Sequence, residues 1–211
     1  MSGVTTIYLI RHGETASNVE GRFRGRADIP LSENGFRQAE ALGLAFRDIE
    51  LSAIYSSPLI RAMQTAEAVA KGRKTPIIEH ESFLNIDLGD WTGKPRAEIE
   101  AKYPELWQKW RTVPEDMVIP GGEGVMDVMR RSLDGLNALA AKHMGEKIAV
   151  VSHRAVLKPL IAGALGILKP FFWKLHLDTV GWSMLRSSQG SFTLVHMNII
   201  NHIENVTVEV V

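Results

Sequence analysis

Two arginines and two histidines in this sequence suit the chemistry of a phosphoryl group. Arg11 and His12 directly follow a short apolar run, Arg61 follows a second, and His153 follows a third. A guanidinium can donate two parallel hydrogen bonds to phosphate oxygens. One imidazole can attack phosphorus while the other stabilises charge on the transferring group. We interpret the set as a site for a phosphate dianion, although the Arg11-His12 pair alone would also suit an exposed basic turn.

Predicted strands must position these side chains. Residues 5–10, 53–57 and 147–152 are short, largely apolar runs, and each stops at a polar or proline-containing segment. If the strands are parallel, their carboxyl ends meet at one edge of a sheet, where ligands bind in open α/β folds. The sequence therefore predicts one site built from distant segments.

Helices are predicted between and after these strands. The first has Ser32 as its N-cap, and a second holds Arg61 in its first turn. A third spans residues 125–143, with apolar residues three and four apart. A fourth should begin near Val156, so that Pro159, which lacks an N–H, falls in its first turn. The expected apolar face of the first helix consists of Phe36, Ala39, Leu42, Leu44 and Phe46.

The segment from about residue 83 to 123 differs from the rest of the chain. Glycine and proline are frequent there, and no long strand pattern is present. Pro104 suits the first turn of a short helix that places Tyr103, Trp107 and Trp110 near one face. We expect an insertion that lies across the active edge of the sheet, although aromatic residues taken singly more often fill a subsidiary core.

The composition limits the remaining possibilities. The 211 residues contain 24 Lys and Arg against 24 Asp and Glu, and they contain no cysteine. A net charge of zero predicts neither a nucleic-acid nor a membrane partner, and without cysteine there is no thiol nucleophile or disulfide. We expect no signal peptide, no bilayer-spanning segment and a cytoplasmic location.

The patterns together predict an α/β fold: a three-layer α/β/α sandwich with a mostly parallel central sheet and a small cap insertion. We expect one catalytic domain over residues 1–211. Residues 77–78 should form an edge or third strand, and residues 181–186 and 191–197 should form a hairpin.

Further motifs run in order through nearly the whole chain. They are Arg11-His12-Gly13-Glu14-Thr15 with Asn18, Asp28-Ile29-Pro30-Leu31, Gly35, Gln38-Ala39, Ser56-Ser57-Pro58-Leu59, Arg61-Ala62, Gln64-Thr65-Ala66, Gly89, Trp91, Gly93, Pro120-Gly121-Gly122-Glu123 and Val151-Ser152-His153. With these motifs the chain resembles the histidine phosphatase superfamily, whose fold is phosphoglycerate mutase-like. The resemblance implies that His12 forms a phosphohistidine, and that Arg11, Arg61, His153 and Asn18 complete the phosphate pocket. It implies no metal and no organic cofactor.

By the same resemblance, the compact insertion fits the phosphatase branch, whose members hydrolyse small phosphate esters. The expected partner is a small phosphorylated substrate, and the expected assembly is a monomer or homodimer. Two alternatives stay open. One is a phosphoglycerate-type mutase, which returns the phosphoryl group to a second substrate hydroxyl. The other is a phosphate-ester binding protein that has lost turnover.

One departure from the family pattern concerns the leaving group. The family places a Glu or Asp, its general acid, four residues before the glycine matched by Gly89, where this chain has Asn85. An amide cannot donate a proton to an alkoxide. Asp87 is the nearest carboxyl, because an extended backbone would point it the same way as Asn85, and Glu81 is a more distant candidate.

Three further residues are expected near the substrate. Arg24 stands where many relatives have Gln, and Gly25 follows it in a loop, residues 16–30, that should lie over the end of the first strand. Arg154 stands where many relatives have Gly. It either adds a cation to the pocket or folds away onto the surface.

Overall fold

The structure, a computed structural model, describes residues 3–16 and 22–203 of the chain. These residues form one six-stranded sheet with the order β3-β2-β4-β1-β5-β6. The strands are β1 (Thr5–Arg11), β2 (Ala53–Ser56), β3 (Ile77–Glu79), β4 (Lys147–Ser152), β5 (Trp182–Ser188) and β6 (Ser191–Ile199). The first four are mutually parallel, whereas β5 is antiparallel to β1 and β6 to β5. The prediction of a mostly parallel sheet is confirmed.

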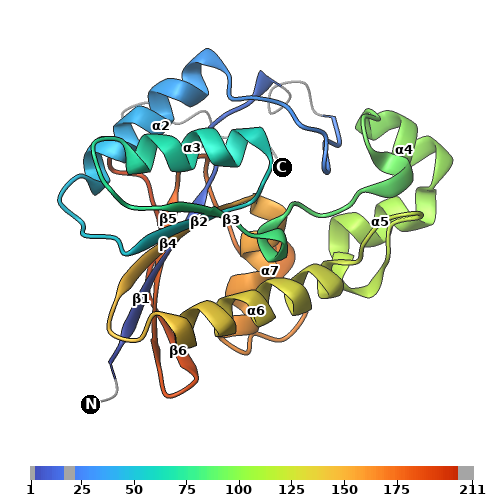
Figure 1. Cartoon of the computed structure of the whole chain (residues 1–211). Helices are drawn as coiled ribbons and strands as arrows, with labels where there is room; N and C mark the ends of the chain where they lie inside the picture. Colours follow the sequence, from blue (N-terminus) through green and yellow to red (C-terminus); the bar gives the residue numbers. More distant parts are fainter. Residues whose placement is uncertain (1–2, 17–21, 204–211) are drawn as a thin grey trace.

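Helices cover both faces of this sheet. The named α-helices are α2 (Glu33–Phe46), α3 (Ile60–Ala70), α4 (Arg96–Lys102), α5 (Pro104–Thr112), α6 (Val125–Lys142) and α7 (Arg154–Ala164). Figure 1 shows α2 and α3 on one face and α6 and α7 on the other, so the predicted three-layer sandwich is confirmed. Within the described part of the chain, no helix is both long and apolar enough to cross a membrane.

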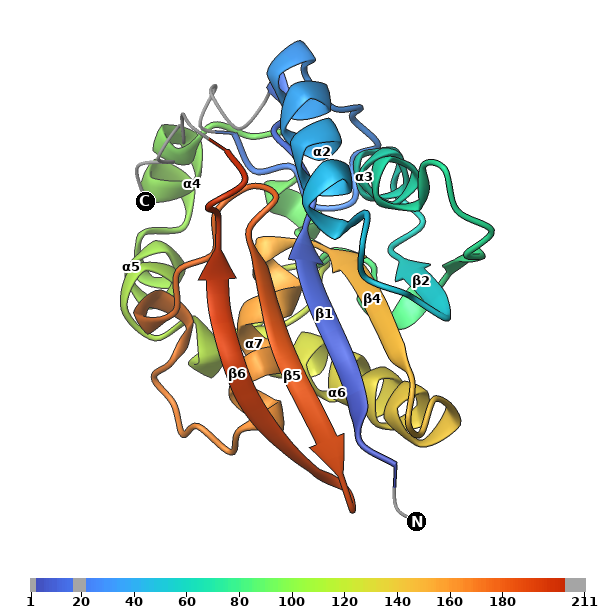
Figure 2. The same ribbon diagram turned by 90° about the vertical axis from the view of Figure 1, so that its left-hand side faces the viewer.

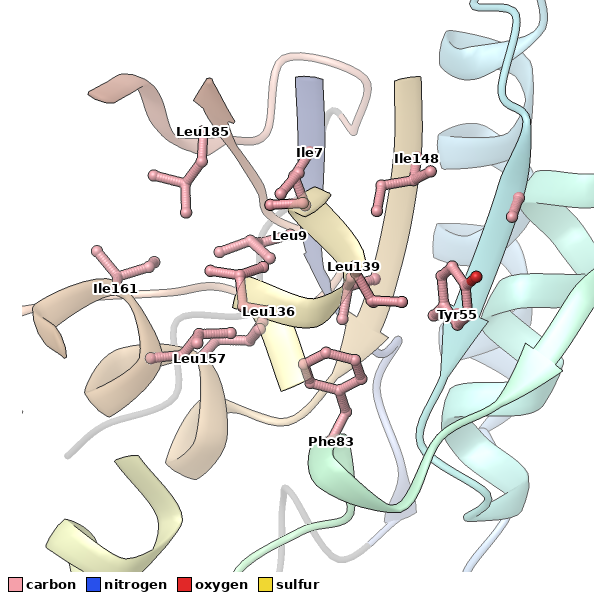
Figure 3. Close-up of a cluster of buried hydrophobic side chains, with 14 of the residues drawn as sticks. Ile7, Leu9, Tyr55, Phe83, Leu136, Leu139, Ile148, Leu157, Ile161 and Leu185 are labelled. Carbon is pink, nitrogen blue, oxygen red and sulfur yellow. The ribbon is translucent and has the colours of Figure 1, made fainter. Parts of the chain in front are cut away.

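The central strands are buried on both faces, as their continuous apolar runs predict. Along β1, Ile7 and Leu9 pack against α6 and α7, while Tyr8 and Ile10 pack against α2 and α3. Figure 3 shows the first of these two clusters, in which Leu136 of α6 meets the β1 side chains. The alternation fixes the register of β1, because a slip by one residue would exchange the two faces.

The buried face of α2 differs from the prediction. Phe36 is 45% exposed and Leu44 is 68% exposed, so neither belongs to the apolar face. The buried residues are Gly35, Gln38, Ala39, Leu42 and Phe46, which follow the three- and four-residue spacing of a helix. Gln38 is buried because its side-chain oxygen accepts a hydrogen bond from the backbone N–H of Glu14. The N-cap prediction is confirmed, since the Ser32 hydroxyl accepts from the N–H of Gly35.

Helix α7 begins two residues earlier than predicted. Its first residue is Arg154, and Pro159 lies in the second turn instead of the first. The N–H groups of Val156 and Leu157 both donate to the carbonyl of His153, which starts the helix directly after β4. Packing of one α7 face in the core compensates for the hydrogen bond that Pro159 cannot make.

The insertion from residue 83 to 123 is helical, without a named strand among its described residues. Besides α4 and α5 it contains the 3-10 helices η2 (Gly89–Trp91) and η3 (Pro114–Asp116). It also includes the last residue of η1 (Glu81–Phe83). Figure 1 shows α4 and α5 to one side of the sandwich, past the start of α6. The ring of Phe23 packs on Trp91 at 5.2 Å between centroids, so the loop after β1 is attached to the insertion.

The last two strands form the predicted hairpin, which Figure 2 shows at the edge of the sheet. The turn is shorter than expected, because Ser188 still pairs with Ser191. Gln189 and Gly190 both have positive φ, as a two-residue turn of the type that matches strand twist requires.

Candidate active site

The ends of three parallel strands bring the candidate residues together, as the sequence predicts. Strand β4 lies between β1 and β2, with Arg11 opposite Ser152 and Ser56 opposite Val151. The residue that follows β4 is His153, and its ring centroid is 5.0 Å from that of His12. Both imidazoles are nearly inaccessible, with exposed fractions of 4% for His12 and 2% for His153.

Backbone contacts fix the ring of His12. Its Nδ1 lies 2.7 Å from the carbonyl oxygen of Gly13. A carbonyl can only accept, so Nδ1 carries the proton and Nε2 keeps its lone pair. Gly13 is held in turn by its own N–H, which donates to the hydroxyl of Thr65. A Cβ on Gly13 would lie 2.7 Å from the carbonyl oxygen of Gly35, so no larger residue fits without displacing α2. The geometry presents Nε2 as a nucleophile.

Burial and neighbouring cations keep His12 neutral. Burial is the main cause of a pKa well below the usual value, and His153, Arg61 and Arg11 lower it further. A neutral imidazole is the form that can attack phosphorus. The cations that lower the pKa would also attract a dianionic substrate.

His153 contacts a side chain that was not among the predicted site residues. Its Nε2 lies 2.8 Å from the hydroxyl oxygen of Ser57, which also accepts from the N–H of Leu59 at 3.4 Å. Among the described residues no other acceptor takes the Ser57 proton, so this hydroxyl donates to Nε2. His153 then carries its own proton on Nδ1, which is buried and has no hydrogen-bond partner. That N–H is available to a phosphoryl oxygen.

The pKa of His153 is also well below its usual value. Burial is the main cause, followed by the charges of Arg61, Arg24, Arg11 and Arg131. The neutral ring is therefore a hydrogen-bond donor that does not depend on an added proton.

The two arginines are held by backbone carbonyls. Arg11 donates from Nη1 to the carbonyl of Leu177 at 2.8 Å. Arg61 donates to the carbonyls of Ala27 at 2.7 Å and Gly25 at 3.1 Å. Burial lowers the pKa of Arg61 to about 10, so it stays charged at neutral pH. Neutral carbonyl oxygens hold the side chain in place, and Asp28 offsets only part of the effect of burial on its pKa, so positive charge remains for an incoming anion.

Helices α3 and α7 begin shortly after the ends of β2 and β4. The N–H of Ile60 at the start of α3 donates to Asp28, and α7 starts directly after His153. Arg154 is the first residue of α7 and is half-buried. The dipole of α7 favours an anion at its first turn. Whether the Arg154 side chain enters the pocket stays a prediction.

Asn85 lies beside the arginine that binds Gly25. Its Nδ2 donates to the Gly25 carbonyl at 2.8 Å, and Arg61 donates to that same oxygen. This contact fixes the orientation of the amide, because the opposite orientation would place two acceptors together. The Oδ1 atom is then a buried acceptor without a hydrogen-bond partner. Gly25 has a positive φ of 51°, a conformation that glycine adopts at little cost.

Asp87 follows in the same segment but is engaged elsewhere. Its Oδ1 accepts from the N–H of Gly89 at 2.9 Å, and its Oδ2 lies 3.4 Å from a guanidinium nitrogen of Arg26. Glu123 accepts two hydrogen bonds from Arg131 and a third from the backbone N–H of Asp87. We call Asn85, Asp87, Glu123, Arg26 and Arg131 the Asn85 cluster.

Most residues predicted from the sequence converge on one place, which we call the histidine–arginine pocket: Arg11, His12, Arg61 and His153. Arg24 is next to it, because it lowers the pKa of His153 and donates to the hydroxyl of Thr15 at 2.8 Å. Asn18 lies outside the described residues. Sequence reasoning missed Ser57, Thr65 and the Arg131–Glu123 pair as supports of the site. The position of Ser57 directly after a strand was the available signal for that residue.

Comparisons with known proteins agree with this geometry. The histidine phosphatase superfamily (branch 1) matches residues 7–200. The chain is 30% identical over 203 residues to phosphoserine phosphatase 1 of Hydrogenobacter thermophilus, which covers 96% of both chains. It is 31% identical over 192 residues to adenosylcobalamin/alpha-ribazole phosphatase of Salmonella typhimurium, covering 91% of this chain and 95% of that one. The solved structure of Bacillus stearothermophilus YhfR superposes with a TM-score of 0.91 at 36% identity, covering 95% of this chain and 100% of that one.

Proposed function

The chain belongs to the histidine phosphatase superfamily, and from that premise we propose that it hydrolyses small phosphate monoesters through a phosphohistidine on His12. The observation that carries the proposal is the fixed, neutral His12 ring, whose Nδ1 donates to Gly13 and leaves Nε2 free. Several relatives carry phosphatase names, among them a phosphoserine phosphatase and an adenosylcobalamin/alpha-ribazole phosphatase.

The proposed reaction has two displacements at phosphorus. In the first, Nε2 of His12 forms a bond to phosphorus while the bond to the leaving oxygen breaks, and that oxygen keeps the electron pair. In the second, water attacks phosphorus, the Nε2–P bond breaks, and phosphate leaves. Arg11, Arg61 and the Nδ1–H of His153 would hold the phosphoryl oxygens throughout, because charged and neutral donors placed in advance stabilise the transition state.

Trapping the intermediate tests the proposal. A short exposure to ³²P-labelled substrate and an alkaline quench should leave acid-labile label on the wild-type chain. His12→Ala should carry no label and should not hydrolyse the substrate. His196→Ala is the matched control, because His196 is an exposed histidine on β6. Label that persists in His12→Ala would overturn the assignment of the nucleophile.

The mutase alternative makes a different prediction for the second displacement. A mutase returns the phosphoryl group to a substrate hydroxyl, so an added alcohol or glycerate would receive the label. We propose that water is the acceptor and that released phosphate accounts for all of the label. We further propose a cytoplasmic enzyme that acts as a monomer or homodimer, and sedimentation in solution measures the assembly.

A further inference from the structure

The main electrostatic causes of the lowered pKa values of the two site histidines are cations and, for His12, the other imidazole. These groups are Arg11, Arg24, Arg61, Arg131 and His153. The site is therefore equipped to attract negative charge, whereas the departure of a basic leaving oxygen requires a proton donor.

Carboxylates in the segments around the site are engaged by hydrogen-bond donors and cations. Glu14 accepts from the hydroxyl of Ser32 on one oxygen and from the amide of Asn34 on the other. Both oxygens of Asp87 and of Glu123 are likewise engaged by donors or by a cation. These carboxylates are therefore occupied by partners outside the histidine–arginine pocket.

Two more carboxylates lie near the pocket cations. Asp28 accepts from the first N–H of α3 and acts on Arg61. Asp178 accepts from His176 and Asn198, and these hydrogen bonds, with Arg11, lower its pKa despite its burial. A further polar side chain, the Asn85 amide, lies beside Arg61. Its Nδ2 donates to the carbonyl of Gly25, and its Oδ1, which can only accept, has no hydrogen-bond partner.

We propose that this enzyme is specific for phosphate groups on weakly basic leaving oxygens: aryl and enol phosphates, acyl phosphates and phosphoanhydrides. The inference rests on the proposed phosphohistidine mechanism and names its substrate class. The leaving oxygen departs as an anion with the electron pair of the P–O bond and takes its proton from solvent. Asn85 determines this specificity by placing an amide where a carboxyl would deliver a proton.

Two substrates of similar size but different leaving-group basicity test the proposal. Phenyl phosphate and benzyl phosphate each carry one aromatic ring, but phenoxide is far less basic than an alkoxide. The quantity to measure is kcat/KM, because it reports phosphoryl transfer to His12 and not the later attack of water. A general acid is worth about 10²–10⁴ in rate, so the wild type should favour phenyl over benzyl phosphate by at least about 10²-fold. Acetyl phosphate should be a good substrate, and phosphoserine a poor one.

Two substitutions of Asn85 test whether this residue sets the preference for phenyl over benzyl phosphate. Asn85→Asp should raise kcat/KM for benzyl phosphate about tenfold or more relative to phenyl phosphate, so the phenyl-to-benzyl ratio should fall. Asn85→Ala is the matched control, because it removes the amide without adding an acid and should leave the phenyl-to-benzyl ratio high. If Asn85→Asp does not fold, the wild-type ratio decides alone.

Equal wild-type values for the two esters would overturn the inference. Asp87→Asn and Glu81→Gln would then show which of the two carboxyls named from the sequence supplies the proton. Failure of the proposed function looks different: neither ester is hydrolysed and no label appears on His12.

Discussion

The histidine–arginine pocket and the Asn85 cluster use charge in opposite ways. In the pocket, Arg61 donates its hydrogen bonds to the neutral carbonyl oxygens of Ala27 and Gly25, and Asp28 acts on it electrostatically. In the cluster, Arg26 and Arg131 are paired with Asp87 and Glu123. Whether an arginine near a site can bind an anionic ligand therefore depends on the partner that holds its side chain. Neutral oxygens leave a guanidinium available, whereas a carboxylate neutralises it.

Removing one arginine from each region should give the largest contrast. Arg61→Ala takes away a buried cation that faces the proposed phosphoryl site, and loss of such a donor typically costs about 10²–10³ in rate. Arg26→Ala removes a half-exposed cation that already has carboxylate partners, so kcat/KM should change less than about tenfold. Steady-state kinetics with phenyl phosphate measures both. Equal losses in the two variants would contradict the contrast.

Acid should lower the free energy of unfolding through the two histidines of the pocket. Both pocket histidines have folded-state pKa values well below the unfolded value. Below about pH 6.5 the unfolded chain binds protons that the folded chain does not, so the free energy of unfolding falls as pH falls, by about 1.4 kcal/mol per pH unit for each histidine. Urea unfolding between pH 7 and pH 5 measures the slope. His12→Asn should reduce this slope by the contribution of one proton.

Ser57 offers a smaller test of how the pocket is set up. Without its hydroxyl, Nε2 of His153 loses the donor that keeps the ring proton on Nδ1. Ser57→Ala should reduce kcat about tenfold, the equivalent of one neutral hydrogen bond. Ser57→Thr should restore much of the rate, because it restores the hydroxyl. Ser56→Ala is the control, since the Ser56 hydroxyl donates to the backbone carbonyl of Ser57 and not to His153. A tenfold loss in Ser56→Ala as well would point to a backbone effect.

The smallest effect is expected for the stability of the cluster. The side chains of Arg26 and Asp87 are 38% and 36% exposed, and such ion pairs contribute about 1 kcal/mol or less. Arg26→Ala should therefore lower the free energy of unfolding by no more than this amount, and added salt should reduce the difference. Thermal unfolding with and without 0.5 M salt, which cuts the screening length to roughly half of its physiological value, measures the difference. A larger loss would mean that Arg26 orders the whole segment.

Local patterns were sufficient to predict the strands and their carboxyl ends, and hence that Arg11, His12, Arg61 and His153 meet. The residues that support the site were not predictable in the same way. Ser57 contacts a histidine 96 positions later, and Gln38 caps a backbone N–H 24 positions earlier. Side-chain hydrogen bonds of this length leave no periodic trace in a sequence. The start of α7 was misplaced for a related reason, because packing in the core overrides the preference of Pro159 for a first turn.

The position of β4 between β1 and β2 also bears on synthesis of the protein. The first two of these strands in the chain, β1 and β2, are not paired with each other, and the strand that joins them starts at Lys147. A ribosome that has made residues 1–146 has therefore produced two strand edges with a gap between them. Pairing over such separations is slow, and unpaired edges are prone to aggregation. Nascent chains shorter than this should bind neither phosphate nor vanadate, and affinity should arise in one step once β4 has emerged.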